Sequence, residues 1–361
     1  RNFFNALGFR PDSRLHFFGN VEASEMISEF PDYKDLILNN CLFYGFNENA
    51  WTLIKEKLNP NSRIAPLLNA RIKVMSNLDI AERRVPQDGR MSLKLGEKWI
   101  DIRVSTLPSS FGERLVLRLL DKADASLDLR ELGMTDEMTK DYLNQLKSTS
   151  GIILVTGPTG SGKTTTLYSG LNYLNDQTRN ILTVEDPIEY ALEGIGQTQV
   201  NNKVGLSFAK GLRAILRQDP DVVMVGEIRD KETAETAIQA SLTGHLVLST
   251  IHTNDAVGAI TRLVDMGVEP YLLASSVKMV IAQRLVRKIN KEGEFSGRIG
   301  IFEMIKIDNK IKELINENIN ENLIRDTAFK KYKSLFKDGE DKVKKGITSD
   351  LELKRVLKEV D

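Results

Sequence analysis

The segment GPTGSGKT, from Gly157 to Thr164, matches the phosphate-binding pattern G-x-x-x-x-G-K-[ST]. Its glycines let the backbone curve so that several N–H groups point at the phosphates of a nucleotide. Lys163 reaches the terminal phosphates, and the Thr164 hydroxyl suits Mg²⁺. The alternative is a glycine-rich turn with an incidental lysine, but an apolar strand precedes the motif and a helix follows it, which favours a site for ATP and Mg²⁺. The residues expected to contact ATP are Gly157, Pro158, Thr159, Gly160, Ser161, Gly162, Lys163, Thr164 and Thr165.

Carboxylates end two of the expected strands. Glu227 follows DVVMVG, and Glu185 ends NILTVE, with Asp186 and Glu189 close behind. An isolated acidic residue after a strand is usually a solvated loop residue, but a phosphate loop nearby favours a catalytic role. One carboxylate can act as general base on the attacking water while another holds a metal-bound water. The order of these roles stays open, with Glu227 favoured for the water, and we expect Thr164, Glu185 and Glu227 at the Mg²⁺.

Two histidines flank the strand HLVLST. We expect His252, which follows the strand, to sense the γ-phosphate, because loss of that phosphate removes a hydrogen-bond partner and can shift the next helix. For His245 a purely structural hydrogen bond is an equally good interpretation.

Arginines on two expected strands, Arg103 in IDIRVST and Arg118 in VLRLL, could neutralise charge in the transition state. An arginine brought from a neighbouring domain or subunit can have a large effect of this kind. Most arginines on strands only pair with surface carboxylates, and that remains the alternative for each of them.

A repeated strand–loop–helix pattern begins at Gly151 and positions these residues. Apolar strands separated by helices indicate a mostly parallel α/β sheet, in which ligands bind beyond the carboxyl ends of the strands. The expected strands are GIILVT, NILTVE, DVVMVG and HLVLST, and the expected helices are Thr164–Asn175, Phe208–Arg217, Lys231–Leu242 and Asp255–Met266.

The chain is expected to contain two domains. Residues 1–60 are predicted to be a helical segment without assigned role, with helices near 21–30 and 51–58. Residues 61–122 alternate at strand period after one helix and predict a small α+β domain. Residues 123–150 are predicted to be a linker and a leading helix at Asp136–Leu146, and 151–361 to be the nucleotide domain with a helical C-terminal subregion.

The composition limits the classes of function. The 50 Lys+Arg balance 50 Asp+Glu, which disfavours a protein that mainly coats nucleic acid. One cysteine and three histidines exclude a disulfide framework and a cysteine-rich zinc site. No apolar run is long enough to span a bilayer, so we expect a cytoplasmic chain that reaches the membrane only through partners.

Longer stretches carry a family resemblance. LTVEDPIEY, GLRAILRQDPDVVMVGEIRDKETAETAIQASLTGHLVLSTIHTNDA and LVDMGVEPYLLASSV resemble the secretion ATPases, in particular the type II secretion branch, and the resemblance covers roughly residues 70 to 361. It implies a RecA-like P-loop NTPase domain after a smaller α+β domain, assembled as a hexamer at the inner membrane. It also implies that ATP hydrolysis powers pseudopilus assembly and protein export, and that Arg103 and Arg118 complete the site between subunits.

The resemblance has limits. Many members carry a four-cysteine zinc module after the segment that matches AQRLVRKI, whereas KINKEGEFSGRIG contains no cysteine, so no zinc is expected. Residues 1–60 match nothing in the family, which leaves docking to cytoplasmic adaptor domains of the secretion platform open. A type IV pilus extension ATPase shares every catalytic motif and is the main alternative. A pilus retraction motor, a nucleic-acid-dependent motor and a non-catalytic scaffold fit less well.

Overall fold

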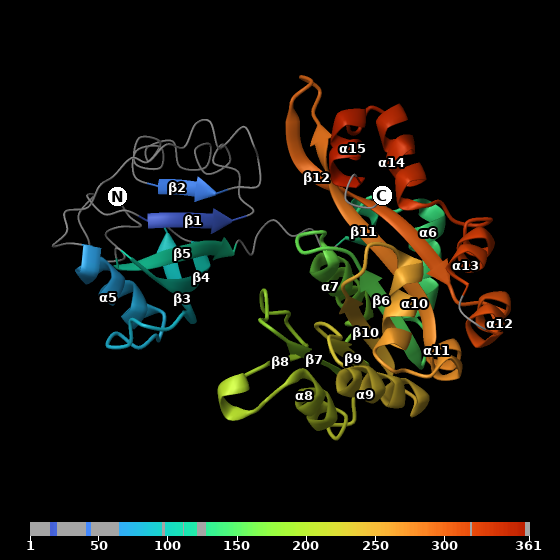
Figure 1. The fold of residues 1–361 in the computed structure, drawn as a ribbon, viewed down its shortest axis with the longest axis horizontal. Helices are drawn as coiled ribbons and strands as arrows, with labels where there is room; N and C mark the ends of the chain where they lie inside the picture. Colours follow the sequence, from blue (N-terminus) through green and yellow to red (C-terminus); the bar gives the residue numbers. More distant parts are fainter. Residues whose placement is uncertain are drawn as a thin grey trace. The chain divides into compact units, whose positions relative to one another are not determined.

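The computed structural model describes residues 15–19, 41–44, 65–95, 98–110, 112–120, 128–317 and 320–357. The chain divides into two compact units, Arg1–Ala125 and Ser126–Asp361 (Figure 1). The predicted leading helix forms as α6 (Asp136–Leu146) and belongs to the second unit. None of the described helices is both long and apolar enough to cross a membrane.

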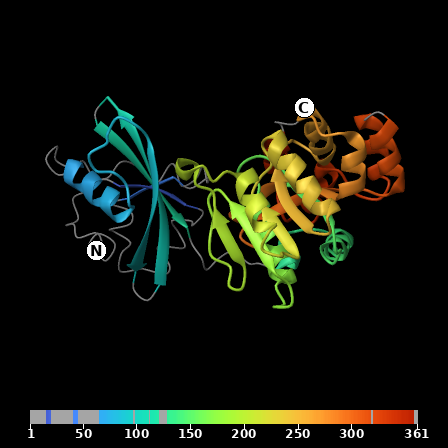
Figure 2. The ribbon, with the colours of Figure 1, turned by 90° about the horizontal axis from the view of Figure 1, so that it is seen from below.

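The described part of the first unit is a five-stranded sheet in the order β2-β1-β5-β4-β3 and the helix α5 (Ala65–Met75), which lies beside the sheet in Figure 2. The alternating sequence predicts strands here, and β3, β4 and β5 form and pair antiparallel, with Met91, Ile102 and Leu117 buried on one face. The strands are β1 (Leu15–Gly19), β2 (Cys41–Tyr44), β3 (Gln87–Leu95), β4 (Lys98–Ser109) and β5 (Gly112–Leu120).

Strands β1 and β2 differ from the expectation for residues 1–60. They pair in parallel with each other, and β1 pairs in parallel with β5, so part of this segment extends the sheet instead of forming a helical segment. The helices expected near 21–30 and 51–58 lie outside the described residues. A strand that adds to an existing sheet gains its stability from distant partners, which local periodicity does not reveal.

The second unit contains a seven-stranded sheet in the order β12-β11-β6-β10-β9-β7-β8, parallel except for the β11–β12 pair. The four strands predicted from the sequence are confirmed as β6, β7, β9 and β10, whereas β8, β11 and β12 were not predicted. The strands are β6 (Gly151–Thr156), β7 (Ile181–Glu185), β8 (Gly196–Gln199), β9 (Val222–Val225), β10 (Leu246–Ile251), β11 (Val277–Ile289) and β12 (Phe295–Lys306).

Helices cover both faces of this sheet. The four helices predicted between the strands are confirmed within two residues as α7–α10, and the C-terminal subregion is helical after β12. Asp230 and Asp255 accept hydrogen bonds from free backbone N–H groups in the first turns of α9 and α10, which sets where these helices begin. The helices are α7 (Lys163–Leu174), α8 (Phe208–Ile215), α9 (Lys231–Leu242), α10 (Ala256–Asp265), α11 (Pro270–Ser276), α12 (Asn309–Glu317), α13 (Glu321–Ala328), α14 (Leu335–Lys344) and α15 (Asp350–Leu357).

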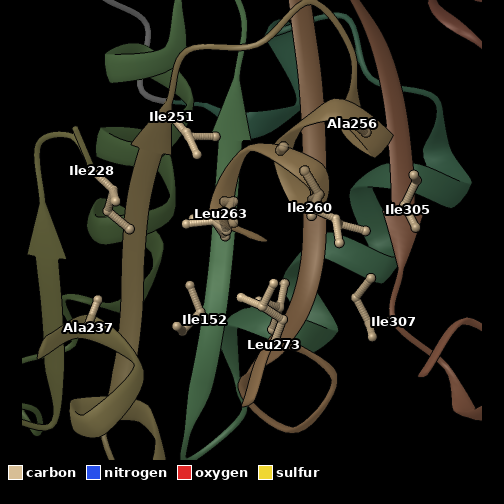
Figure 3. Close-up of a cluster of buried hydrophobic side chains, with 14 of the residues drawn as sticks. Ile152, Ile228, Ala237, Ile251, Ala256, Ile260, Leu263, Leu273, Ile305 and Ile307 are labelled. Carbon is tan, nitrogen blue, oxygen red and sulfur yellow. The ribbon is translucent and has the colours of Figure 1, made fainter. Parts of the chain in front are cut away.

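Successive residues of β6 point into two different cores. Ile152 and Leu154 join the cluster under α8–α11, part of which Figure 3 shows, and the C-terminal helices add to the same cluster. Ile153 and Val155 join the cluster under α6 and α7. A strand that is apolar on both faces must be covered on both, so the unit has helix–sheet–helix layers. The carboxyl ends of the parallel strands are thereby held at a common edge.

Glu352 connects α15 to the long strand β11. Its carboxylate accepts hydrogen bonds from the guanidinium groups of Arg287 and Arg355, at 2.8–3.0 Å. Burial alone raises the pKa of this carboxyl, but the hydrogen bonds from Arg355 and Arg287 outweigh it and bring the pKa to about 2. The group therefore stabilises the folded chain wherever it is ionised.

These contacts of Glu352 predict a pH-dependent effect of Glu352→Gln on stability. The folded pKa of about 2 lies below the unfolded value of 4.5, so the stabilisation is complete above pH 4.5 and is lost as the pH falls toward 2. We expect Glu352→Gln to cost about 2 kcal/mol at pH 7 and progressively less below pH 4.5. Thermal unfolding of both chains from pH 7 down to pH 3 measures this. A gap that stays constant with pH would contradict the ion-pair explanation.

Candidate active site

The phosphate-binding loop connects β6 to α7 in the geometry that the motif predicts. Gly157, Gly160 and Gly162 have φ values of +146°, +79° and +85°, which residues other than glycine rarely adopt. A Cβ atom on Gly157 would also collide with the backbone carbonyl of Gln283. The loop is therefore shaped by its glycines and by the β11 strand beside it.

Lys163 lies at the first position of α7 and is almost completely buried. Its ammonium donates hydrogen bonds to the carbonyls of Gly157 and Pro158, at 2.8 and 2.9 Å. The pKa of Lys163 is lowered to about 8, chiefly by burial, while the charge of Glu227 acts to raise it and that of Arg284 to lower it. A desolvated cation at the start of a helix, within a loop of backbone N–H groups, is suited to bind an anionic phosphate.

Glu227 follows β9 and is held by its backbone neighbours. The Gly226 N–H donates to the Val184 carbonyl and the Ile228 N–H to the Thr250 carbonyl, both at 2.8 Å, so the segment is tied to the strands on either side. The Glu227 carboxylate forms an ion pair with Arg229. Its Oε2 atom is buried and accepts no hydrogen bond from the described residues. An acceptor placed in this way is suited to a water molecule or the hydration shell of a metal ion.

His252 follows β10 and lies against Glu227, with its Nε2 atom 3.4 Å from Glu227 Oε2. Burial and then the charge of Lys163 lower the pKa of His252 below 6.5, against the opposing effect of Glu227. The imidazole is therefore neutral at pH 7, with one N–H to donate. The structure thus brings Lys163, Glu227 and His252, expected from three separate segments, into one site. His245, at the other end of β10, hydrogen-bonds to the Ala240 carbonyl and has the structural position considered for it.

Glu185 ends β7 and is buried, but its surroundings differ from those expected of a base or a metal ligand. Oε1 accepts hydrogen bonds from Thr183 (2.6 Å) and Gln197 (3.0 Å), and Oε2 accepts one from the Tyr168 hydroxyl. Burial and then the charge of Glu185 raise the pKa of Tyr168 far above 10, so this phenol remains a donor. Two donors thus hold Oε1 and one holds Oε2, so these contacts direct Glu185 toward Thr183, Gln197 and Tyr168.

Two residues of β11 complete the surroundings of the loop and were missed in the sequence. Gln283 accepts a hydrogen bond from the Thr166 hydroxyl at 2.7 Å and fills the space beside Gly162. Arg284 is buried and donates to the Asn254 carbonyl at 2.9 Å. They lie in the segment AQRLVRKI, which has no motif of its own; their role follows from the pairing of β11 with β6, which places them beside the loop.

Arg103 and Arg118 lie in the first unit, directly opposite each other on β4 and β5. Like charges at opposed positions of antiparallel strands repel each other and destabilise the pair. Arg90 on β3 is in turn directly opposite Arg103, so three arginines form a row across one face of the sheet. A row of this kind favours contact with an anionic group.

Comparisons with known proteins identify the family of this chain. The model of the type II/IV secretion system protein family matches residues 49–360. The type II secretion system protein E of Pseudomonas aeruginosa is 54% identical, over 94% of this chain and 81% of the relative. The type II secretion system ATPase E of Vibrio cholerae is 52% identical, over 85% of this chain and 68% of the relative.

A solved structure supports the fold. The pilus retraction motor PilT with bound ADP superposes with a TM-score of 0.64 and 32% sequence identity, over 75% of this chain and 77% of that chain. The predicted fold, an α/β ATPase domain with a mostly parallel sheet, is confirmed. From its phosphate loop, its sheet and these relatives, the chain belongs to the type II/IV secretion system protein family.

Proposed function

We propose that this chain is a motor ATPase that hydrolyses ATP to power pseudopilus assembly and protein export by type II secretion. The observation that carries the proposal is the juxtaposition of Lys163 in the phosphate loop with Glu227 and His252 from two other strand ends. Relatives with the same secretion role in their names are more than half identical to this chain. This similarity favours secretion over the pilus extension role, which uses the same chemistry.

In the proposed reaction the phosphates of ATP lie on the loop from Gly157 to Thr164. Lys163 turns from the loop carbonyls to the terminal phosphates, where its charge stabilises the transition state. Glu227 orients the attacking water through Oε2, which lies 3.4 Å from His252 Nε2 and accepts no hydrogen bond from the described residues. His252, neutral and beside Glu227, donates its N–H to the γ-phosphate and so registers whether that phosphate is present.

The donor set fits Mg²⁺, which prefers oxygen ligands and keeps several waters. The Thr164 hydroxyl would bind the ion directly, and Glu227 would hold one of its waters through Oε2, a buried acceptor that receives no hydrogen bond from the described residues. When bound, the ion would neutralise charge on the phosphates. Glu185 fits this role less well than expected, because three donors already engage its carboxylate.

The same contacts bear on the general base. Glu185 is tied to Tyr168, Thr183 and Gln197, whereas the carboxylates after it are more accessible, with Asp186 exposed and Glu189 half-buried. We therefore keep Glu227 as the favoured residue for the water and consider Glu189, not Glu185, as its competitor from β7.

The assembly and partners follow from the family resemblance. We propose a cytoplasmic homo-hexamer that contacts the inner-membrane secretion platform and its adaptor domains. Arg103 and Arg118 then supply positive charge to the phosphates at the contact between subunits, which explains why the first unit maintains opposed arginines. Release of this contact after hydrolysis would let the two units rotate and do mechanical work.

Phosphate release from ATP–Mg²⁺ over a wide range of protein concentration tests the proposed function. If subunits complete one another's sites, we expect specific activity to rise with concentration and to level off once rings have formed. Light scattering on the same samples reports the oligomeric state. Full activity from a chain that stays monomeric would refute the ring. No activity under any of these conditions would refute the ATPase assignment for the isolated chain.

A further inference from the structure

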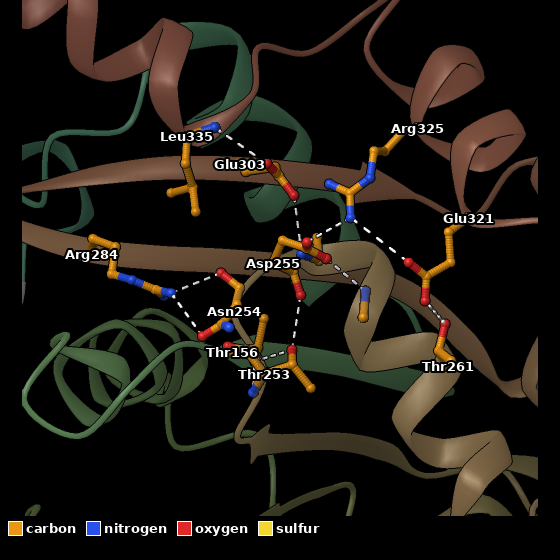
Figure 4. Close-up of polar contacts among 12 residues, drawn as sticks. Thr156, Thr253, Asn254, Asp255, Thr261, Arg284, Glu303, Glu321, Arg325 and Leu335 are labelled. Atoms are coloured by element: carbon orange, nitrogen blue, oxygen red, sulfur yellow. Dashed lines mark hydrogen bonds and ion pairs between the residues drawn. The ribbon is translucent and has the colours of Figure 1, made fainter. Parts of the chain in front are cut away.

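The loop that carries His252 is anchored at its far end by acidic residues that the reaction does not use. Asp255, three residues after His252, caps α10 by accepting a hydrogen bond from the Gly258 N–H at 2.7 Å. Its other carboxylate oxygen, Oδ2, accepts a hydrogen bond from Arg325 of α13 at 2.6 Å (Figure 4). One side chain thus joins the start of α10 to a helix seventy residues further along the chain.

Glu303 of β12 makes a second connection at the same place. It is buried, and its Oε1 accepts the N–H of Ala256, the first residue of α10, at 3.0 Å. Its Oε2 accepts the N–H of Leu335, the first residue of α14, at 3.2 Å. One carboxylate therefore holds the amino ends of two helices, where its negative charge is favoured. The movement of either helix start requires the other to move or a buried hydrogen bond to break.

Arg325 is the cation that makes this arrangement stable. Asp255 and Glu303 are close enough that the charge of Asp255 helps to raise the pKa of Glu303, after the larger effect of burial, while the charge of Arg325 lowers it. Arg325 also lies 3.9 Å from Glu321, which accepts a hydrogen bond from Thr261 of α10. Without Arg325, two neighbouring carboxylates would face each other in a poorly solvated place.

The beginning of the same loop contacts β6, the strand that leads into the phosphate-binding loop. Thr156, the residue before Gly157, accepts a hydrogen bond from the Thr253 N–H at 2.9 Å. The hydroxyl groups of Thr156 and Thr253 also form a hydrogen bond with each other. Arg284 holds the Asn254 carbonyl. Four consecutive residues, Thr253 to Ala256, are therefore bound by groups from β6, β11, β12 and α13. Figure 4 shows these contacts for Thr253, Asn254 and Asp255.

We infer that Asp255, Glu303 and Arg325 are positioning residues for ATP hydrolysis, which hold the His252 loop in register and couple it to α13 and α14. The inference rests on the proposed function of His252 as the γ-phosphate contact. When His252 gains or loses that contact, the segment from Thr253 to Ala256 moves with it. The two carboxylates transfer that movement to the first turn of α14 and to α13.

The test compares Arg325→Met and Arg325→Lys with the wild-type full chain. Lys331→Met is the matched control, because Lys331 is a cation of the same subregion that pairs with Asp141 of α6, at 2.7 Å, and not with Asp255 or Glu303. We expect Arg325→Met to lower kcat about tenfold with KM for ATP and affinity for ADP within about twofold, and Arg325→Lys to restore part of the loss. Lys331→Met should match the wild type.

A second variant separates coupling from folding. Asp255→Asn keeps an N-cap side chain for α10 but removes the charge that Arg325 neutralises. It should lower kcat like Arg325→Met, and the double variant should lose no more than either alone, because both break one connection. Additive losses, or equal losses of kcat, affinity and melting temperature, would assign these residues a merely structural role and overturn the inference.

Hydrogen exchange measures the coupling of the His252 loop to α13 and α14 without ATP turnover. Adding the non-hydrolysable analogue AMP-PNP with Mg²⁺ should change the exchange of α13 and α14 amides in the wild type and in Lys331→Met, but not in Arg325→Met. The same response in Arg325→Met would overturn the inference, as would no response in the wild type. A wild-type chain that hydrolyses no ATP would instead refute the proposed function, and the exchange response would still decide the coupling.

Discussion

Lys163→Ala is expected to reduce ATP hydrolysis to background, at least about 10³-fold, without loss of the fold. The Lys163 ammonium is the buried cation of the phosphate loop, and Lys163 is the one lysine in the motif GPTGSGKT. Its two hydrogen bonds go to carbonyls of the same loop, so the substitution frees acceptors next to a space that water can reach. The expected loss is therefore catalytic and not structural.

The effect on stability has a defined sign. Folding lowers the pKa of Lys163 from 10.5 to about 8, so the unfolded chain binds more protons between these values and burial of the lysine costs stability at pH 7. Lys163→Ala removes that cost. We expect its melting temperature at pH 7 to equal or exceed that of the wild type.

Phosphate release and thermal unfolding of the same preparations check both expectations. Lys310→Ala, an exposed lysine on α12, is the control for loss of a positive charge. Retained turnover in Lys163→Ala would refute the site assignment, and a large fall in its melting temperature would show that the loop needs the lysine to fold.

The arrangement of the candidate site could be predicted because its signals are local. The phosphate loop, Glu227 and His252 each follow an apolar strand of a parallel sheet, and the carboxyl ends of such strands meet at one edge. Three short motifs were therefore enough to predict the fold class and the proximity of these residues. The same reasoning placed Glu185 correctly at the end of β7, because the apolar run of NILTVE ends at that residue.

The surroundings of Glu185 could not be predicted. Whether a carboxylate at a strand end is available for chemistry depends on its neighbours, here Tyr168 from α7 and Gln197 from β8. Neither residue belongs to a recognisable pattern with Glu185, and β8 is short and has no apolar signal. Long-range pairing likewise hid β1 and β2, as well as the contact of Gln283 with the phosphate loop.

Glu227→Gln is the second large expected effect: ATP binding persists while hydrolysis falls by about 10²- to 10³-fold. Glutamine has nearly the same shape and can still contact Arg229 and His252, so the binding loop keeps its form. It lacks the charge that orients and deprotonates water. Retention of labelled ATP on filters, alongside phosphate release, separates binding from turnover.

Glu185→Gln and Glu189→Gln complete the comparison. The geometry predicts that Glu185→Gln acts mainly on stability, because it weakens a buried network with three donors, at a cost of about 1–3 kcal/mol. If Glu189 is the base, Glu189→Gln retains nucleotide and stops turnover with an unchanged melting temperature, and the main effect of Glu227→Gln is then to raise the Mg²⁺ concentration that turnover needs. If Glu185→Gln alone stops turnover at full stability, its buried carboxylate must leave Tyr168 during the cycle. That result would make the strand end of β7 the moving part of the site.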